Sequence, residues 1–549
     1  MRKNVFENMP DVRYARSKFS LDHGVKTTMT VGNLYPLDMQ EVLPGDSFKT
    51  KMTGVMRVTS AFLKPVIDNA FLEVYHFFVP LRLVYDDLEE VFGVAKPTAY
   101  TMDLFKTIPT IGGTNLTVAP GSVGDYLGLP VGTTVFPGIS ILPYRAFAHV
   151  YNDWFRNESI TNEVLVQSGA WSSSTEVPNG NAWSPTNYVG MLPKVAKKRD
   201  YFTSCLPSPQ KGPAVGLSLV ANAPLTTGPN YQLGTRRFAY GVVNDANVHN
   251  LVLRADSTVD VPKMYQGTSS VADTPLYPSG NGYFSNMYAD LSGVSAINVN
   301  DLRTLFQLQK MLEKDARYGS TYREYSFGHF GVVSPDARLQ YTEYLGGGRI
   351  PLAVQQVPQT SEAGSTPQGN VAGYSFTNGY SRFSKGFVEH GYILTVGCIR
   401  QYHSYQQGIP KLFMRKDRED FYDPLFANLG EQPVYTSEIY GYKSGTQSLK
   451  TNVFGYNEAW AEYRYAPNKI TGQMRSGIGN SLDIWHFGDY YSSAPTLSDS
   501  FILENSVNVD RSLAVPSSSQ DNFLVDLWFD TKAIRVMPAY SVPGLVDHH

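Results

Sequence analysis

Apolar and polar positions alternate with a period of two along a stretch near the start of the chain. Its apolar members share one face: Phe48, Met52, Met56, Val58 and Phe62. Its basic members lie on the opposite face: Lys49, Lys51 and Arg57. Successive side chains of a strand point to opposite sides, so this pattern predicts a long β-strand with one buried and one solvated face. Residues 523–529 repeat the alternation and predict a closing strand.

Two other stretches are apolar on both faces, NAFLEVYHFFVP at 69–80 and the first part of GYILTVGCIRQYHSY at 391–405. A strand of this kind lies in the middle of a sheet that is covered on both sides. The Pro-Gly pair of LPGD at 43–46 is a turn signal. Long strands joined by turns indicate an antiparallel sandwich or barrel, and no fixed-period repeat interrupts the pattern.

Elsewhere the apolar spacing changes to that of a helix. In residues 142–158 one stripe consists of Phe147, Val150, Tyr151, Trp154 and Phe155, with Arg145, Asp153 and Arg156 expected on the polar side. A short helix is expected at 84–92. A further helix should begin near Asp301, a good N-cap residue, and stop at Gly319.

The segment 317–348, RYGSTYREYSFGHFGVVSPDARLQYTEYLGGG, is polar and aromatic. We interpret it as a strand, a turn at Ser334-Pro335-Asp336 and a second strand that ends in a glycine-rich corner. The three consecutive glycines at 346–348 suit a place where a sheet bends or where another strand approaches closely. Its aromatic and arginine side chains are typical of a surface that meets other protein.

These patterns divide the chain into four parts. Residues 1–24 are polar and basic and predict an extended N-terminal arm, with a frayed terminus as the alternative. Residues 25–211 and 301–549 carry the two halves of a β core. Residues 212–300 are rich in Gly, Ser, Asn and Thr with short β-like pieces, and predict a small folded insertion. The stretches at 95–140 and 168–190 look like surface loops, and 355–385 is again rich in Gln, Ser, Gly and Asn.

Composition narrows the class of protein. Charged residues make up only 17% of the 549 residues, and aromatics reach 13% with 36 Tyr, which favours a β protein with much surface buried between subunits. The net charge of −3 means that any nucleic-acid contact must be local. Cys205 and Cys398 exclude a disulfide framework and leave at most one bridge. The first 18 residues have no apolar core and no run reaches the roughly 18 apolar residues of a membrane span, so neither a signal peptide nor a membrane segment is expected.

The densest basic cluster is a candidate nucleic-acid contact. It consists of Lys194, Lys197, Lys198 and Arg199, followed by the aromatics Tyr201 and Phe202. Cations beside rings suit single-stranded nucleic acid, whose phosphates meet the charges and whose bases stack on the rings. A solvated turn or a salt bridge between subunits explains the same charges. The basic arm, with Arg13, Arg16 and Lys18, is a second candidate.

No enzyme motif is present: there is no GxxxxGK[ST], GxSxG, HExxH or CxxC sequence. No catalytic residue, metal ligand or cofactor is therefore assigned. The carboxylates Asp417, Glu419, Asp420 and Asp423 alternate with basic residues, which favours a solvated or inter-subunit charge patch over a glycosidase pair or a Ca²⁺ shell. The pair His548-His549 is read as ordinary sequence.

A series of segments in fixed order closely resembles the major capsid proteins of the microviruses, small single-stranded DNA bacteriophages, and above all their gokushovirus branch. The segments include EVLPGDSFK at 41–49, KPVIDNAFLEVYHFFVPLRLVYD at 64–86, LPYRAFAHVYNDWFRNE at 142–158, KRDYFTSCLPSPQKG at 198–212, SYQQGIP at 404–410 and the terminal RVMPAYSVPGLVDHH. Each is weak alone, but the series covers nearly the whole chain.

This resemblance implies a single antiparallel jelly roll, an eight-stranded β-barrel with long inserted loops and a few short helices. It implies a T=1 icosahedral shell of sixty copies, assembled in the cytoplasm of a host bacterium, that encloses circular single-stranded DNA together with a small basic DNA-binding virion protein. Residues 212–300 would form a threefold protrusion that contacts a host cell-surface receptor. A carbohydrate-binding β protein is the alternative function, and a glycosidase is the third.

On this interpretation the chain is not an enzyme, and its main partner is itself. The aromatic and arginine residues of two segments are the candidate subunit contacts: Tyr322, Arg323, Tyr325, Arg338, Tyr341, Tyr344, Tyr463, Arg464 and Tyr465.

Overall fold

A computed structural model describes residues 15–94, 106–112, 116–132, 134–135, 138–176, 180–215, 225–227, 250–256, 259–268, 271–275, 287–289, 299–362, 364, 368–442 and 448–540. The chain divides into two compact units. The first comprises residues 1–212 and 310–549, and the second comprises Pro213–Gln309.

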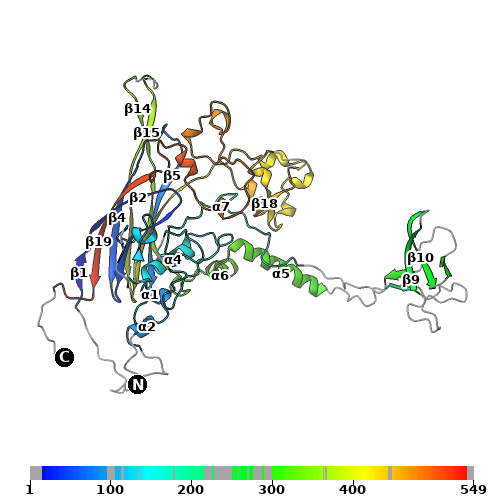
Figure 1. The fold of residues 1–549 in the computed structure, drawn as a ribbon, viewed down its shortest axis with the longest axis horizontal. Helices are drawn as coiled ribbons and strands as arrows, with labels where there is room; N and C mark the ends of the chain where they lie inside the picture. Colours follow the sequence, from blue (N-terminus) through cyan, green and yellow to red (C-terminus); the bar gives the residue numbers. More distant parts are fainter. Residues whose placement is uncertain are drawn as a thin grey trace, which may run out of the picture. The chain divides into compact units, whose positions relative to one another are not determined.

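Two antiparallel sheets form the centre of the first unit (Figure 1). The larger sheet has the order β1-β19-β4-β15-β14, with β2 also paired to β19, and the smaller sheet has the order β13-β5-β16-β3. Their strands are β1 (Ser17–Ser20), β2 (His23–Met29), β3 (Leu34–Val42), β4 (Ser47–Val58), β5 (Ala70–Pro80), β13 (Glu343–Pro351), β14 (Val354–Pro358), β15 (Val371–Gly386), β16 (Gly391–Gln401) and β19 (Phe523–Arg535).

The pairing order is that of a jelly roll. Leaving aside β1 and β14, the larger sheet runs β2-β19-β4-β15 and the smaller runs β3-β16-β5-β13, four strands each. Numbered along the chain, these strands pair as 1-8-3-6 and 2-7-4-5, so consecutive strands alternate between the two sheets except for the fourth and fifth, β5 and β13, which are neighbours in the smaller sheet. The expected jelly roll is therefore confirmed as two packed sheets rather than a closed barrel.

The alternating sequence pattern places the core between these sheets. On β4, Met52 and Met56 point inward and are fully buried, and on β19 Leu527 and Phe529 do the same. They pack against the inner face of β5, including Leu72. The outer side chains of β4 remain exposed, as the period of two predicts.

The second face of the smaller sheet is covered by chain that lies between β5 and β13 in the sequence. Helix α4 (Leu142–Trp154) packs there with Phe147 and Val150 against Phe77 of β5 and Val396 of β16. The expectation that 69–80 and 391–405 are central strands is thereby confirmed, since β5 and β16 are buried on both faces. The excursion at 95–140 is not only surface, because its Val118 joins this core.

Arg145 corrects the predicted helical face. The residue was expected on the polar side of α4, but it is fully buried. Its guanidinium binds the equally buried carboxylate of Glu176, with 2.7 Å between Nε and Oε1 and 3.1 Å between Nη2 and Oε2. The loop at 168–190, which looked like a surface segment, supplies this partner, so the pair ties the loop to the helix.

The predicted strand before residue 332 is also wrong, because Tyr322–Phe330 form helix α6. Thr321 caps it: its side chain accepts a hydrogen bond from the Glu324 backbone, and Glu324 reaches back to Thr321. This reciprocal Thr-x-x-Glu capping box is a helix-start signal in the sequence itself. It outweighs the β propensity of the aromatic residues. Gly331, with φ 69°, ends the helix.

The three-glycine sequence lies inside β13 rather than at a corner. A Cβ at Gly346 would lie 2.7 Å from the Arg382 carbonyl oxygen, and one at Gly348 would lie 2.5 Å from the Tyr380 carbonyl oxygen. Glycine is required because β15 of the other sheet passes directly over this strand.

The other elements of the first unit are short. They are α1 (Leu81–Val84), α2 (Leu88–Val91), β6 (Leu116–Thr117), α3 (Val123–Tyr126), β7 (Thr134–Val135), β17 (Gln432–Tyr435), β18 (Val453–Asn457), α7 (Asp499–Ile502), α8 (Val507–Asp510) and the 3-10 helices Lys411–Met414, Arg418–Asp420, Pro424–Phe426, Thr436–Glu438, Ala461–Tyr463, Gly472–Met474 and Asp483–Trp485. Helix α5 (Val299–Tyr318) starts two residues before its expected cap and ends before Gly319 as predicted.

One further boundary differs from the sequence interpretation, and one alternative that the sequence left open is decided. The arm boundary expected at residue 24 is wrong, because β1 and β2 already belong to the larger sheet from Ser17 onward. Cys205 and Cys398 are both free and buried, so no bridge joins them.

In the second unit, β9 (Asn250–Asp256), β10 (Val259–Thr268) and β11 (Val271–Pro275) form an antiparallel sheet, and β8 (Leu225–Thr227) pairs with β12 (Met287–Ala289).

Candidate assembly and genome-facing surfaces

The basic cluster at 194–199 is split by the fold. Lys194 and Arg199 are exposed. Lys197 is only 5% exposed, and its ammonium lies 4.8 Å from the centroid of the Phe501 ring. A lysine enclosed in this way has little surface left to offer a phosphate.

Lys198 takes part in an ion network around Glu73 of β5. The Lys198 ammonium lies 2.5 Å from Oε1 of Glu73, and Arg349 and Arg400 bind the same carboxylate at 3.0 Å and 2.5 Å. Burial raises the pKa of Glu73, but Arg400 and Lys198 outweigh it and lower the pKa to about 2. The contacts of Lys197 and Lys198 thus favour a structural role, and their genome-facing role stays a prediction.

The second genome-facing candidate is the basic arm. Arg16 and Lys18 are exposed, and Lys18 lies on β1 at the edge of the larger sheet. Arg13 lies outside the described residues, as do His548 and His549.

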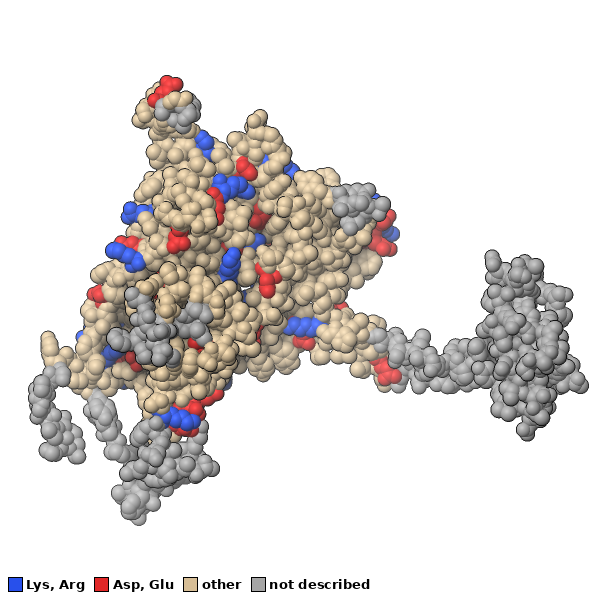
Figure 2. Space-filling model, viewed as in Figure 1, with Lys and Arg blue, Asp and Glu red and all other residues tan. Residues whose placement is uncertain are grey.

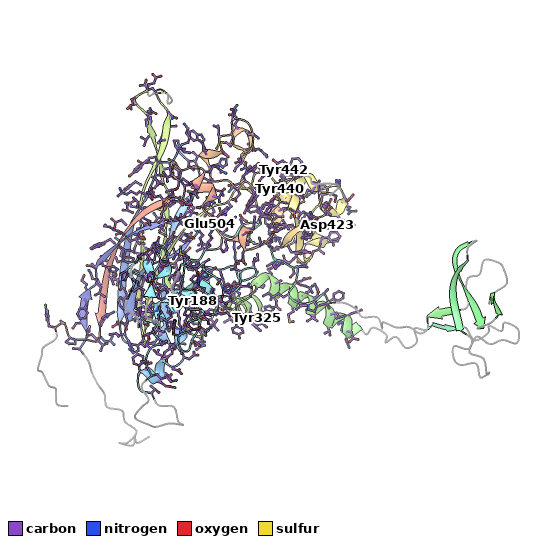
Figure 3. All side chains as sticks on the ribbon, in the orientation of Figure 1. Tyr188, Tyr325, Asp423, Tyr440, Tyr442 and Glu504 are labelled. Carbon is purple, nitrogen blue, oxygen red and sulfur yellow. The ribbon has the colours of Figure 1, made fainter. Side chains whose placement is uncertain are left out.

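The candidate subunit contacts on and around α6 have two different environments. Tyr322 and Tyr325 are 64% and 40% exposed, and Tyr325 stacks on His329 with ring centroids 4.4 Å apart (Figure 3 labels Tyr325). Arg323 instead turns inward, with its guanidinium 4.4 Å from the Trp154 ring and 5.5 Å from the Tyr341 ring. Arg323 and Tyr341 therefore join α6 to α4.

The remaining candidates divide in the same way. Arg338 is exposed, and Tyr344 is 44% exposed while its ring packs against Phe77.

In the loop region, Tyr463 is half exposed beneath the guanidinium of Arg415, 4.3 Å from its ring. Arg464 pairs with Glu458 at 3.0 Å, and Tyr465 stacks on Tyr201 with centroids 5.5 Å apart. Only the exposed members of the set are free to contact a second chain.

Large exposed apolar side chains mark two surfaces more sharply than the tyrosines do. The α6 surface consists of Tyr322, Phe327, Phe330, Val332 and Val333, which are 55–75% exposed. The 411–429 surface consists of Leu412, Phe413, Phe421, Leu425 and Leu429, which are 46–88% exposed. Clusters of this kind mark interaction sites, because a monomer gains nothing by exposing them. The sequence carries a signal for the second surface in the aromatic run FYDPLF at 421–426.

The outer face of the larger sheet is a surface that the sequence interpretation left unassigned. The exposed side of β4 carries Lys49, Lys51 and Arg57, and the neighbouring strands add the exposed rings of Trp528 and Tyr380. Elsewhere, on the face shown in Figure 2, Lys and Arg are interspersed with Asp and Glu. The alternating pattern that predicted β4 had already placed these three cations on the solvated face of the strand, opposite the face that joins the core.

The buried charged groups of the loop region are paired with one another. His403 lies between Asp489 and Glu504, at 2.7 Å and 3.0 Å (Figure 3 labels Glu504). Burial lowers the pKa of His403, but the two carboxylates outweigh it and raise the pKa to about 10. We call these three residues the His403 cluster.

The acidic residues at 417–423 act as helix caps. Asp417 and Asp420 form a capping box around a 3-10 helix, and Asp423 accepts a hydrogen bond from the Leu425 backbone. Among the described residues, no group of three or more His, Cys, Asp or Glu side chains is arranged to hold a metal ion. Over the same residues, no helix combines the length and apolar character needed to cross a bilayer.

The family model and the similar proteins found by sequence comparison are all phage capsid proteins. The family model "Capsid protein (F protein)" matches residues 7–545. The chain is 36% identical over 550 residues to capsid protein VP1 of Bdellovibrio phage phiMH2K, covering 99% of this chain and 98% of that protein. It is 37% identical over 553 residues to capsid protein VP1 of Spiroplasma virus 4, with 96% and 95% covered.

Capsid protein VP1 of Chlamydia phage 1 is 35% identical over 595 residues, with 99% of this chain and 98% of that protein covered. These matches confirm the resemblance to the microvirus capsid proteins that the series of sequence segments indicated. They also confirm the interpretation of the chain as a structural protein of a virion rather than an enzyme. The chain belongs to the phage capsid protein (F protein) family.

Proposed function

We propose that this capsid protein assembles with copies of itself into a closed T=1 icosahedral shell around a single-stranded DNA genome. The observation that carries the proposal is the pair of exposed apolar surfaces, the α6 surface and the 411–429 surface. Both are built on loops that a two-sheet core holds in place, which suits contacts between identical subunits.

The magnitudes favour stable association. Burying one Leu or Phe side chain contributes roughly 1.5–3 kcal/mol, and residues such as Phe330, Val333, Phe413 and Leu425 are at least 69% exposed in the single chain. A few of these at each contact offset the cost of association, which is about 4–15 kcal/mol. In a closed T=1 shell every subunit makes the same set of contacts as every other subunit, so the gain repeats for each copy.

We propose two further partners by analogy with the family: a basic DNA-binding protein and a host cell-surface receptor. The net charge of −3 is consistent with a separate basic protein that accompanies the DNA. The insertion at 212–300 is the proposed host-contact surface, and its deletion should spare assembly while reducing adsorption to cells. Assembly in the bacterial cytoplasm is consistent with the two free cysteines.

Negative-stain microscopy and sedimentation of the purified full-length chain test the self-assembly. We expect megadalton particles of uniform size. Leu425→Asp should abolish them because it places a charge in a buried contact, while Leu425→Met, a volume-conserving control, should leave them intact. A chain that stays monomeric under all assembly conditions would refute the proposal, and particles that form unchanged with Leu425→Asp would show that Leu425 is not in a contact.

A further inference from the structure

The outer face of the larger sheet brings cations and aromatic rings into register. Thr53 of β4 pairs with Trp528 of β19 on one side and with Tyr380 of β15 on the other. Trp528 is 54% exposed and Tyr380 is 61% exposed. Two large rings therefore stand on either side of a small central residue, on three adjacent strands.

Between the rings the surface is hollowed. A depression of about 1100 Å³ spans β2, β19, β4 and β15 and is lined by Gly24, Thr53, Val55, Trp528 and Tyr380 among others. Gly24 pairs with Trp528 and has no side chain; a Cβ there would lie 3.3 Å from the indole ring. The missing side chain leaves the flank of the indole open. The volume is comparable with the roughly 300–1,000 Å³ of sites that take small organic ligands.

The charges around this depression are predominantly positive and unpaired. Four cations of the face, Lys49, Lys51, Arg57 and Arg382, form no ion pair with any other described residue. The register places Lys51 opposite Arg382, and Arg57 opposite Phe376.

The carboxylates of the face are already paired with lysines. Asp526 pairs with Lys26 at 3.0 Å, and Asp530 shares Lys532 with Asp22, at 3.1 Å and 2.9 Å. A protein with a net charge of −3 thus concentrates free positive charge on one exposed sheet face.

We propose that this face, which we call the strand-binding face, binds unpaired nucleotides of single-stranded DNA. Phosphates would meet Lys51, Arg57 and Arg382, and bases would stack on Trp528 and Tyr380. The inference rests on the proposed function, since it turns this face toward the genome inside the shell. It also assigns the genome contact to the sheet rather than to the cluster at 194–199, half of which the fold encloses.

Charge and shape select this ligand over the alternatives. A basic virion protein would be repelled by a face with four unpaired cations. A duplex keeps its bases stacked inside, so it cannot use the rings of Trp528 and Tyr380, whereas a single strand offers both phosphates and base faces. A neutral polysaccharide can stack on rings but gives the cations no partner.

The experiment measures binding of a short fluorescent oligothymidylate to the purified, unassembled full-length chain by fluorescence anisotropy. Three phosphates neutralised on a single strand predict that the logarithm of the binding constant falls with the logarithm of salt concentration with a slope of about −2.1. Trp528→Ala should weaken binding by roughly 5- to 150-fold, while Trp528→Phe, which keeps a ring, should bind nearly as well as the original chain.

The charge variant Lys51→Gln/Arg57→Gln should reduce the salt slope by about 1.4. Its matched control is Lys469→Gln, which removes an exposed cation from a loop outside this face and should change nothing. Lys194→Gln/Arg199→Gln tests the competing cluster. All of these positions except Trp528 carry solvated charges, and thermal unfolding of each variant confirms that it is folded.

Three results would overturn the inference: equal losses in the Lys469 control, a larger loss from the Lys194/Arg199 variant, or binding that is independent of salt and is displaced by a neutral polysaccharide. Particle formation is scored separately by microscopy. Shells that form without any oligonucleotide binding refute the strand-binding face and leave the capsid function standing, whereas a chain that never assembles refutes the function itself.

Discussion

The buried ion pair between Arg145 and Glu176 offers the sharpest test of how the loops are held on the jelly roll. Both side chains are fully inaccessible to solvent. Besides the two bonds between them, Arg145 donates to the carbonyl oxygens of Gly169 at 2.9 Å and Val84 at 3.2 Å. Glu176 accepts from the Tyr188 hydroxyl and the Ser172 backbone (Figure 3 labels Tyr188).

Glu176→Gln keeps the shape of the side chain and removes its charge, so the guanidinium is left buried without a counter-charge. Removing one partner of a buried pair typically costs about 3–5 kcal/mol. Arg145→Met should cost a similar amount, because a carboxylate is then buried with only neutral donors. The double variant should cost less than the sum of the two by about 0.5–3 kcal/mol, since no unpaired charge remains.

Urea unfolding of the unassembled chain, followed by tryptophan fluorescence, measures these effects. Trp171 and Trp183 pack against this core and report on it directly. The matched control is Glu163→Gln, which breaks the 3.9 Å pair with Arg156; Glu163 is 64% exposed, so less than about 1 kcal/mol is expected. If Glu176→Gln shifts the midpoint no more than Glu163→Gln does, the reasoning about burial is wrong.

Three further predictions concern other parts of the chain. The free energy of unfolding contributed by the His403 cluster is fully present below pH ~6.5 and falls by about 1.4 kcal/mol per pH unit as the pH rises toward 10, the folded-state pKa of His403. Urea midpoints measured across this range should show the decline, and His403→Gln should remove it. Gly348→Ala should destabilise by about 1–3 kcal/mol, because its Cβ would lie 2.5 Å from the Tyr380 carbonyl oxygen; an unchanged melting temperature would contradict this. Thr321→Ala should cost about 1 kcal/mol and speed amide exchange in residues 322–330, whereas Thr321→Ser should preserve the cap.

The strand-binding face and the cluster at 194–199 show why charge in a sequence is a poor guide to a binding surface. Lys197 and Lys198 are adjacent to other cations in the chain, yet one lies over Phe501 and the other neutralises Glu73. Arg57 and Arg382 are separated by more than 300 positions in the chain, yet both lie on the outer face formed by paired strands. A cluster in sequence reports proximity only along the backbone, and the sheet register decides which charges meet.

The sequence by itself determined the β class, the strands β4, β5, β16 and β19, and the faces of β4 that are buried and solvated, because side-chain alternation is a local property of an extended chain. It also contains the capping box of α6, a helix-start signal that competes with the β propensity of the aromatic residues. Only the tertiary structure decided that Arg145 is buried, that β15 is the strand which the glycines at 346–348 admit, and that the cations of β4 join the rings of β15 and β19. Those facts depend on which distant segments pack together, and no local pattern encodes the partner.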